Sequence, residues 1–353
     1  MDTIWWNKIP NAAQFIQRIS DTVNEGNSII LQLPETIPWY GTLRAELEED
    51  LRKQNSLGGL RFLNSENIND PGEYLFRNNC KSEIRAEYRP SIGYARFLAE
   101  HEEIVLHEDI YWICIDSDKN LELWIAFVEA YYSKIPRGKS KCRFIFETRT
   151  HEVLNDRKRI KVISYNDSIE HYDNVLFNML VASSTNGNEI YKRYLAEAVS
   201  LMFPSDVEFA AKCISNGKLF LSDAKSTIES IANNCVRSDG SPFDLDITDD
   251  VINERLWEAQ IKIIFPIIEH YRNHIVQKYH DEISSALPIT TNYGDTITSA
   301  ADVELGPITS LVAGGKVNMT SADYQKVVKY KDARNSLAHF SLLTQQEVDY
   351  IIS

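Results

Sequence analysis

The run Asp109-Ile-Tyr-Trp-Ile-Cys-Ile-Asp116 is the most strand-like segment of this 353-residue sequence. An unbroken series of bulky apolar residues is typical of a strand buried on both faces, as in a parallel sheet. Similar runs occur at 28–33 and 142–146, and helical periodicity appears between them at 42–53 and 121–132. Strands that alternate with helices predict an α/β fold, a mainly parallel sheet with covering helices, for the first part of the chain.

The rest of the sequence favours helices. Residues 167–234 are mostly helical in pattern, and Arg237–Asp250, with its Ser-Asp-Gly-Ser-Pro run, is the most linker-like segment. A long helix is expected at about 248–283 with a kink at Pro266. We therefore expect three parts: an α/β domain at 1–165, a helical middle region with linker at 166–245, and an all-α bundle at 246–353.

The composition is that of an ordinary globular protein, with 43% hydrophobic and 25% charged residues. The five cysteines are scattered and form no C-x-x-C pair, so neither a zinc site nor a disulfide framework is expected. No cofactor motif stands out. The sequence shows no secretory leader and no apolar run long enough to span a bilayer, which favours a cytoplasmic protein without membrane contact.

Positive charge is concentrated in one segment of an otherwise acidic chain. The net charge is -14, yet 134–161 holds ten Lys or Arg residues against three acids, an excess of seven. Such a run is either a solvated loop and strand edge or a docking patch for RNA, DNA or an acidic partner. The candidate nucleic-acid-binding residues are Lys139, Lys141, Arg143, Arg157, Lys158 and Arg159.

The strand that ends at Asp116 is similar to the Mg²⁺-side strand of a P-loop NTPase. A phosphate-binding loop also needs a Gly-rich turn after an early strand, because its amides hold the phosphates. The segment after 28–33 instead begins with Pro34 and contains no Lys before Thr42. Gly138-Lys139-Ser140 follows a helix and precedes a strand, the reverse of the required order. The first part thus loosely resembles a degenerate NTPase module, and we expect weak or no nucleotide binding.

The last fifth of the chain contains Lys331-Asp-Ala-Arg334-Asn335-Ser-Leu-Ala-His339-Phe340. On a helix, Asn335 and His339 share a face, whereas Arg334 lies about 140° from His339. Ala333, Leu337 and Phe340 form the apolar stripe expected to face the core.

This motif resembles the R-x4–6-H motif of the HEPN superfamily, helical-bundle domains of toxins and of defence and RNA-processing nucleases. The resemblance implies a metal-independent endoribonuclease with Arg334, Asn335 and His339 as catalytic residues. It further implies a homodimer whose two motifs meet at the interface, and a product with a 2′,3′-cyclic phosphate. The apolar residues of the long helix, including Trp257, Ile264 and Ile268, exceed what one small bundle buries on a single face, which agrees with a dimer or with packing on the N-terminal part.

Two functional hypotheses follow. In the first, RNA is the substrate, and the α/β part senses a trigger or binds a neutralising protein, as in bacterial defence or toxin–antitoxin control. In the second, the chain is a non-enzymatic scaffold or regulator that dimerises through its bundle and binds protein or nucleic-acid partners.

Overall fold

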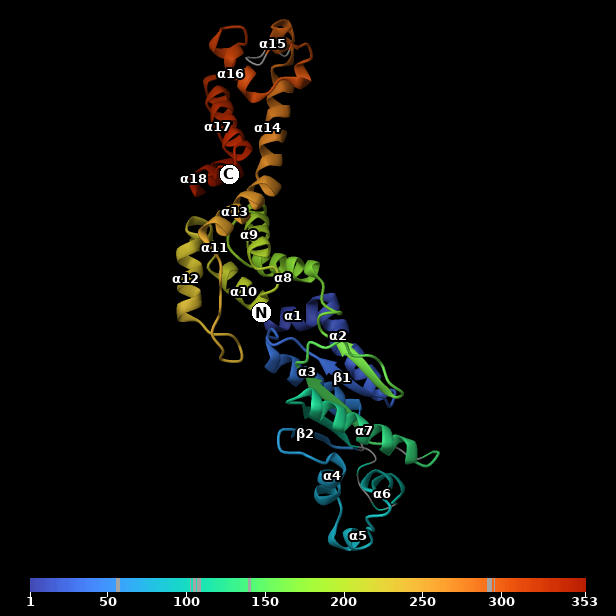
Figure 1. The fold of residues 1–353 in the computed structure, drawn as a ribbon. Coiled ribbons are helices and arrows are strands. Elements are labelled where there is room, and N and C mark those ends of the chain that lie inside the picture. Colours follow the sequence, from blue (N-terminus) through green and yellow to red (C-terminus); the bar gives the residue numbers. More distant parts are fainter. Residues whose placement is uncertain are drawn as a thin grey trace. The chain divides into compact units, whose positions relative to one another are not determined.

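The computed structural model describes residues 1–54, 58–101, 103, 106, 109–138, 141–290, 294 and 296–353. The chain divides into two compact units, Met1–Asp173 (unit 1) and Asn174–Ser353 (unit 2), which Figure 1 colours from blue to green and from green to red. Helix α8, His171–Ser183, contains the boundary. Within the described ranges, every helix is too short or too polar to span a lipid bilayer.

Unit 1 is built on a parallel sheet, as the sequence predicts. Its strands in the described residues are β1 (Ser28–Gln32), β2 (Leu60–Asn64), β3 (Ile110–Cys114), β4 (Arg143–Thr148) and β5 (Ile160–Ser164). They are arranged in the order β2-β3-β4-β1-β5, and each neighbouring pair is parallel. Parallel neighbours need crossover connections, and the intervening helices supply them.

Helices cover both faces of the sheet because alternate strand residues point to opposite sides. Tyr111 and Phe144 belong to a buried cluster that includes Trp124 of α7. On the other face, the guanidinium of Arg44 in α3 lies 5.3 Å from the ring of the buried Trp112. The helices of unit 1 are α1 (Asp2–Lys8), α2 (Pro10–Asn24), α3 (Tyr40–Gln54), α4 (Pro71–Asn79), α5 (Ser82–Ala86), α6 (Tyr94–Glu100) and α7 (Asp118–Lys134).

Strand β5 lies in the basic segment and was not expected there. Ile160 and Ile163 are buried, whereas Lys161 is exposed and pairs with Asp156 at 2.9 Å. An edge strand with one open side carries charged residues between its apolar ones, so it lacks the continuous apolar run of β1 and β3.

Unit 2 is almost entirely helical. Its helices are α9 (Glu189–Met202), α10 (Val207–Ser215), α11 (Gly217–Ser222), α12 (Ala224–Asn234), α13 (Asp249–Ile263), α14 (Phe265–Lys278), α15 (His280–Ser285), α16 (Leu305–Ala313), α17 (Ser321–Ala338) and α18 (Gln345–Ile352), with a 3₁₀ turn, η2 (Ala300–Asp302). A two-stranded ribbon pairs β6 (Ile289–Thr290) with β7 (Thr296–Ile297). Helix α13 packs on α9, and α14 lies beside α17 (Figure 1).

The single long helix expected at 248–283 is wrong in detail. Helix α13 ends at Ile263, α14 begins at Phe265, and a further break at Tyr279 precedes α15. Pro266 stands in the first turn of α14. Because proline has no amide hydrogen to donate, it is tolerated at a helix start and interrupts a helix interior.

The linker-like segment 237–250 is tied to the helices of unit 2. The guanidinium of Arg237 pairs with Asp206 at 2.5 Å. The buried ring of Phe243 meets Phe209 edge-on, with the ring centroids 5.0 Å apart. These contacts hold the segment against α10.

Candidate functional site

The topology of the sheet places a candidate ligand site of unit 1 at the carboxyl edge. The chain passes from β1 to β2 in one direction along the sheet and from β4 to β5 in the other. In open α/β sheets, ligands bind outside the carboxyl ends of the strands where the order reverses in this way. The ends of β1 and β4, at Gln32 and Thr148, mark that position.

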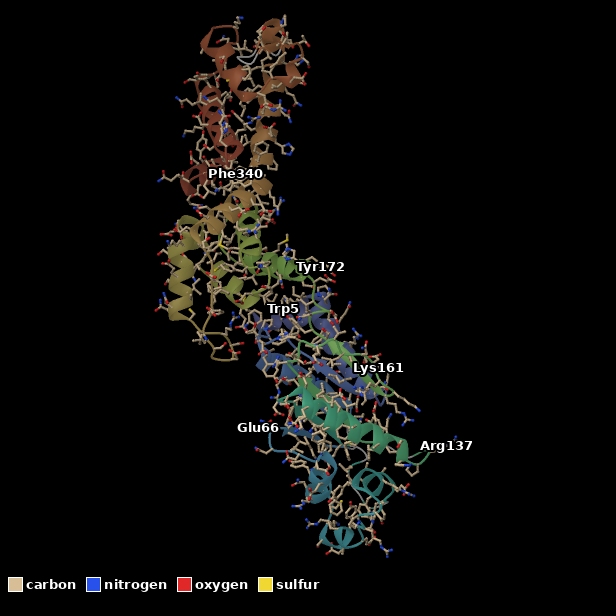
Figure 2. The ribbon with its side chains drawn as sticks, viewed as in Figure 1. Trp5, Glu66, Arg137, Lys161, Tyr172 and Phe340 are labelled. Atoms are coloured by element: carbon tan, nitrogen blue, oxygen red, sulfur yellow. The ribbon has the colours of Figure 1, made fainter. Side chains whose placement is uncertain are left out.

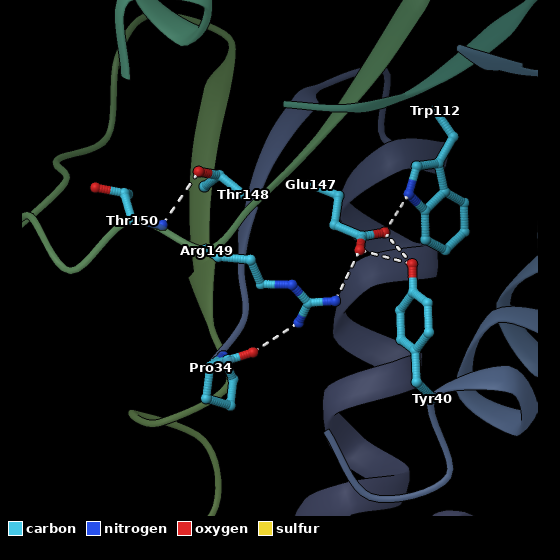
Figure 3. A network of polar contacts seen from close by, with 7 residues as sticks. All are labelled: Pro34, Tyr40, Trp112, Glu147, Thr148, Arg149 and Thr150. Carbon is cyan, nitrogen blue, oxygen red and sulfur yellow. Dashed lines mark hydrogen bonds and ion pairs between the residues drawn. The ribbon is translucent and has the colours of Figure 1, made fainter. Parts of the chain in front are cut away.

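A network of paired polar groups occupies this position (Figure 3). The buried carboxylate of Glu147 accepts hydrogen bonds from Tyr40 Oη at 2.6 Å and Trp112 Nε1 at 2.8 Å. Arg149 donates to Glu147 Oε1 at 3.1 Å and to the carbonyl oxygen of Pro34 at 2.7 Å. Burial and the Glu147 carboxylate raise the pKa of Tyr40. These donors all bond acceptors within the protein, and Pro34 has no amide hydrogen that could bond a phosphate.

Asp116, the acidic residue that follows β3, takes part in a second set of hydrogen bonds. Its carboxylate accepts from Ser65 Oγ and from Asn120 Nδ2, the latter at 2.7 Å. The bond from Ser65, followed by that from Asn120, lowers the pKa of Asp116. No cluster of three or more His, Cys, Asp or Glu residues with metal-binding geometry occurs in the described residues.

Gly138, the first residue of the Gly-Lys-Ser segment, lies at the opposite edge of the sheet. Gly138 forms a turn after α7 with a φ of +80°, ahead of the amino end of β4. Lys139 and Ser140 fall outside the described residues. A phosphate-binding loop follows the carboxyl end of a strand, so the position of Gly138 does not suit that role.

The chain matches no protein-family model. A search of curated proteins likewise finds no match. Among solved structures, RuvB of Thermotoga maritima aligns with a TM-score of 0.34 and 12% identity, covering 72% of this chain and 76% of that one. The ORC2 protein of Aeropyrum pernix, solved in ADPNP–ADP complexes, aligns with a TM-score of 0.32 and 11% identity, covering 96% and 83%.

In unit 2, Arg334 lies in the last two turns of α17 and reaches toward Glu304. The two side chains form an ion pair of 3.4 Å between Arg334 Nη2 and Glu304 Oε2. The Arg334 side chain is 34% exposed, and its buried Nε has no hydrogen-bond partner in the described part of the chain. The guanidinium is therefore only partly engaged within the chain.

Asn335 and His339 are both exposed. Helix α17 ends at Ala338, and His339 is its C-cap, with its backbone N–H donating to the carbonyl oxygens of Asn335 and Ser336 at 3.1 Å. Across the described residues, no hydrogen bond joins the side chains of Arg334, Asn335 and His339. The motif is presented at one helix end without being assembled into a closed site.

Phe340 departs from the expected apolar stripe. Ala333 and Leu337 are buried as expected, but Phe340 is 72% exposed. The reason is that the helix has already ended, and Phe340 takes a left-handed φ of +59°. Its ring stacks on Trp257 with centroids 3.8 Å apart and planes at 15°. Trp257 Nε1 in turn donates to the carbonyl oxygen of Leu337 at 2.8 Å.

The apolar residues that suggested a dimer have partners within this chain. Ile264 and Ile268 are fully buried, and Trp257 is taken up by its stack on Phe340. Helix α13 packs on α9 of the same unit. Ile264 and Ile268 therefore supply no surplus apolar surface, whereas Trp257 is half-buried, so these two isoleucines give no support to a dimer.

Five of the six expected nucleic-acid-binding residues are described in the structure, and Lys139 lies outside the described residues. Arg157 is paired with Glu122 at 2.8 Å. Lys141, Arg143 and Arg159 come close to one another at the amino edge of the sheet, and Lys158 is exposed. No local sequence signal points to the contacts of Glu304, Trp257 or the Glu147 network, because their partners are distant in the chain.

Proposed function

We propose that the chain is a metal-independent endoribonuclease of HEPN type, in which Arg334, Asn335 and His339 act on RNA. The observation that carries the proposal is the placement of all three at the end of α17, with His339 exposed and Arg334 only partly engaged. In this proposal residues 246–353 form the nuclease bundle, 166–245 a helical connection, and 1–165 a regulatory domain that responds to a trigger or neutralising protein.

The chemistry follows from the side chains. One imidazole removes the proton from a ribose 2′-OH, whose oxygen attacks the adjacent phosphorus. The bond from phosphorus to the 5′-oxygen breaks, and a second imidazole protonates that oxygen. The products are a 2′,3′-cyclic phosphate and a free 5′-hydroxyl. Arg334 stabilises the charge that develops on the phosphoryl oxygens. Asn335 orients the imidazole or donates to the phosphate.

One copy of the motif supplies one imidazole, whereas this mechanism uses a base and an acid. A two-fold dimer presents the same patch twice and so supplies both. The exposed ring of Phe340 beside His339 gives the end of α17 an apolar surface that a second copy can cover. We therefore propose a homodimer that joins the two motifs in one groove.

The test is cleavage of labelled RNA by the full chain in EDTA. The wild type is expected to cut, and His339→Ala and Arg334→Ala are expected to lose activity by roughly 10²-fold or more. His280→Ala is the matched control, because His280 is also an exposed histidine of unit 2. A reaction that needs Mg²⁺, or one that His339→Ala leaves intact, contradicts the proposal.

A non-enzymatic regulator is the second candidate, and the Glu304–Arg334 ion pair favours it. An arginine that serves to fasten α16 to α17 has a structural role. In that case Arg334→Ala lowers the melting temperature, while the chain shows no RNA cleavage in any state of assembly.

A further inference from the structure

The amino edge of the sheet brings together basic residues from distant parts of unit 1. Strand register pairs Ile29 with Ile145 and Ser28 with Ile160. Arg143 lies two residues before Ile145, and Arg159 lies one residue before Ile160. Both are level with Asn27, on opposite sides of β1. Neighbouring strands lie about 4.8 Å apart, so the two backbones are separated by about 10 Å at this level.

Lys141 completes this cluster. Its ε-carbon lies 3.3 Å from where a Cβ would stand on Gly26, the turn residue before β1. Its ammonium lies 5.1 Å from the centroid of the Tyr132 ring, an attractive cation–π geometry. Partial burial, and then the charges of Arg159 and Arg143, lower the pKa of Lys141. We call Lys141, Arg143 and Arg159 the amino-edge cluster.

Two acidic side chains of this part of unit 1 are paired with other cations. Glu122 pairs with Arg157, and Asp156 pairs with Lys161. In the described residues, neither Lys141 nor Arg159 forms an ion pair with a carboxylate. Lys141 and Arg159, two cations without a carboxylate partner, repel each other, and a bound anion relieves that repulsion.

Further exposed cations extend the charge beyond the cluster. Lys134 and Arg137 lie at the end of α7 and in the turn after it, and Lys158 lies in the turn before β5. Figure 2 shows Arg137 and Lys161 at the same margin of unit 1. A stripe of separate cations fits a ligand with several phosphates in a row better than a single phosphate group.

We propose that the amino-edge cluster binds the phosphate backbone of a single nucleic-acid strand. Lys141 and Arg159 each neutralise a phosphate, and the exposed cations around them extend the contact. The site lies at the opposite edge of the sheet from the Glu147 network and uses no base contacts, so it binds with little sequence preference. It stands on residues of unit 1 alone and does not depend on the nuclease proposed for unit 2.

The experiment measures fluorescence anisotropy of a labelled oligouridylate with the full chain carrying His339→Ala, so that any cleavage is prevented. Each lost phosphate contact lowers the slope of log affinity against log salt by about 0.7 for a single strand. Lys141→Ala/Arg159→Ala is therefore expected to lower the slope by about 1.4 and to weaken binding by about tenfold or more at low salt.

Lys53→Ala is the matched control, because Lys53 is an exposed cation of unit 1 that is paired with Glu49 at 2.5 Å. It is expected to bind like the parent, and Lys141→Arg is expected to retain binding. A double variant that keeps its melting temperature and binds RNA as well as Lys53→Ala overturns the proposal. Competition by tripolyphosphate tests the ligand: strong tripolyphosphate binding without oligouridylate binding also overturns it, and assigns the cluster to small polyphosphates.

Discussion

Arg149 donates a hydrogen bond of 2.7 Å to the carbonyl oxygen of Pro34, and this bond ties the loop after β1 to the end of β4. A nucleotide phosphate bound by a P-loop would need free amide donors in that loop. Here the loop instead presents the carbonyl oxygen of Pro34 to the Arg149 guanidinium, which also donates a hydrogen bond to Glu147.

Unit 1 is accordingly expected to bind ATP and GTP no more tightly than about 1 mM, with or without Mg²⁺. Isothermal titration calorimetry checks this. Micromolar binding that disappears in Lys139→Ala would show that the segment 138–140 holds phosphate after all.

Removal of the Glu147 carboxylate is expected to destabilise unit 1 by about 3 kcal/mol, because its buried donors lose their acceptor. The donors concerned are on Tyr40, Trp112 and Arg149. Urea denaturation of Glu147→Ala measures the change. Glu152→Ala, an exposed acid in the loop after β4, serves as control and is expected to stay within about 0.5 kcal/mol of wild type.

Glu304→Gln separates the nuclease from the scaffold hypothesis. If Arg334 binds phosphate, Glu304 competes with RNA for it, and an exposed ion pair of this kind is worth about 0.2–1 kcal/mol. RNA affinity is then expected to rise by at most about fivefold. Glu258→Gln, which weakens the ion pairs of Glu258 with Arg255 and Lys262, is the control. Unchanged RNA affinity together with a lower melting temperature would favour the scaffold.

Two substitutions of Phe340 separate its stacking from its backbone strain. Phe340→Ala removes the stack on Trp257 but keeps a side chain at a positive φ, and is expected to cost about 1 kcal/mol. Phe340→Gly removes the same ring and also relieves the strain, which for a non-glycine residue is of the order of 1 kcal/mol. Thermal unfolding should therefore find the glycine variant the more stable of the two. The reverse order would mean that the left-handed turn is not strained.

Acid sensitivity of unit 2 is expected from Asp323. Hydrogen bonds from Lys278, Tyr279 and Thr320 lower its pKa from 3.8 to about 2. Because the folded-state value lies below the unfolded one, the stabilisation is fully present well above pH 3.8 and is lost as the pH falls through about 2. With the side chain 22% exposed, the contribution is about 1–2 kcal/mol after solvent screening.

Asp323→Asn should therefore lower stability at pH 7 and flatten the decline between about pH 4 and pH 2. Urea denaturation across that range measures both effects. If the variant and the wild type lose the same stability between about pH 4 and pH 2, the pKa of Asp323 does not differ between the folded and the unfolded chain.

The sequence predicted those elements whose signal is local. Strands β1 and β3 were found because both of their faces are buried, and the helical patterns at 42–53 and 121–132 correspond to α3 and α7. Strand β5 was missed because its edge position admits Lys161. Strand order had no local signal, since the β1–β4 pairing joins residues more than a hundred positions apart.

The surroundings of the candidate sites depend on contacts of the same long range. Tyr40 and Glu147 are 107 positions apart, and Trp257 and Leu337 are 80 positions apart. Periodicity placed Phe340 in the core because it continues the stripe of Leu337, but the position where a helix stops decides which way the next ring points. The end of α17 at Ala338 was not signalled by a glycine or proline.

The stack of Trp257 on Phe340 also gives the molecule a built-in optical probe. An indole in van der Waals contact with the residue that follows His339 changes its emission when that turn moves or when another ring displaces Phe340. The difference in fluorescence between wild type and Trp257→Phe therefore follows the end of α17 directly. Such a signal would time the arrival of RNA or of a second copy without any attached dye.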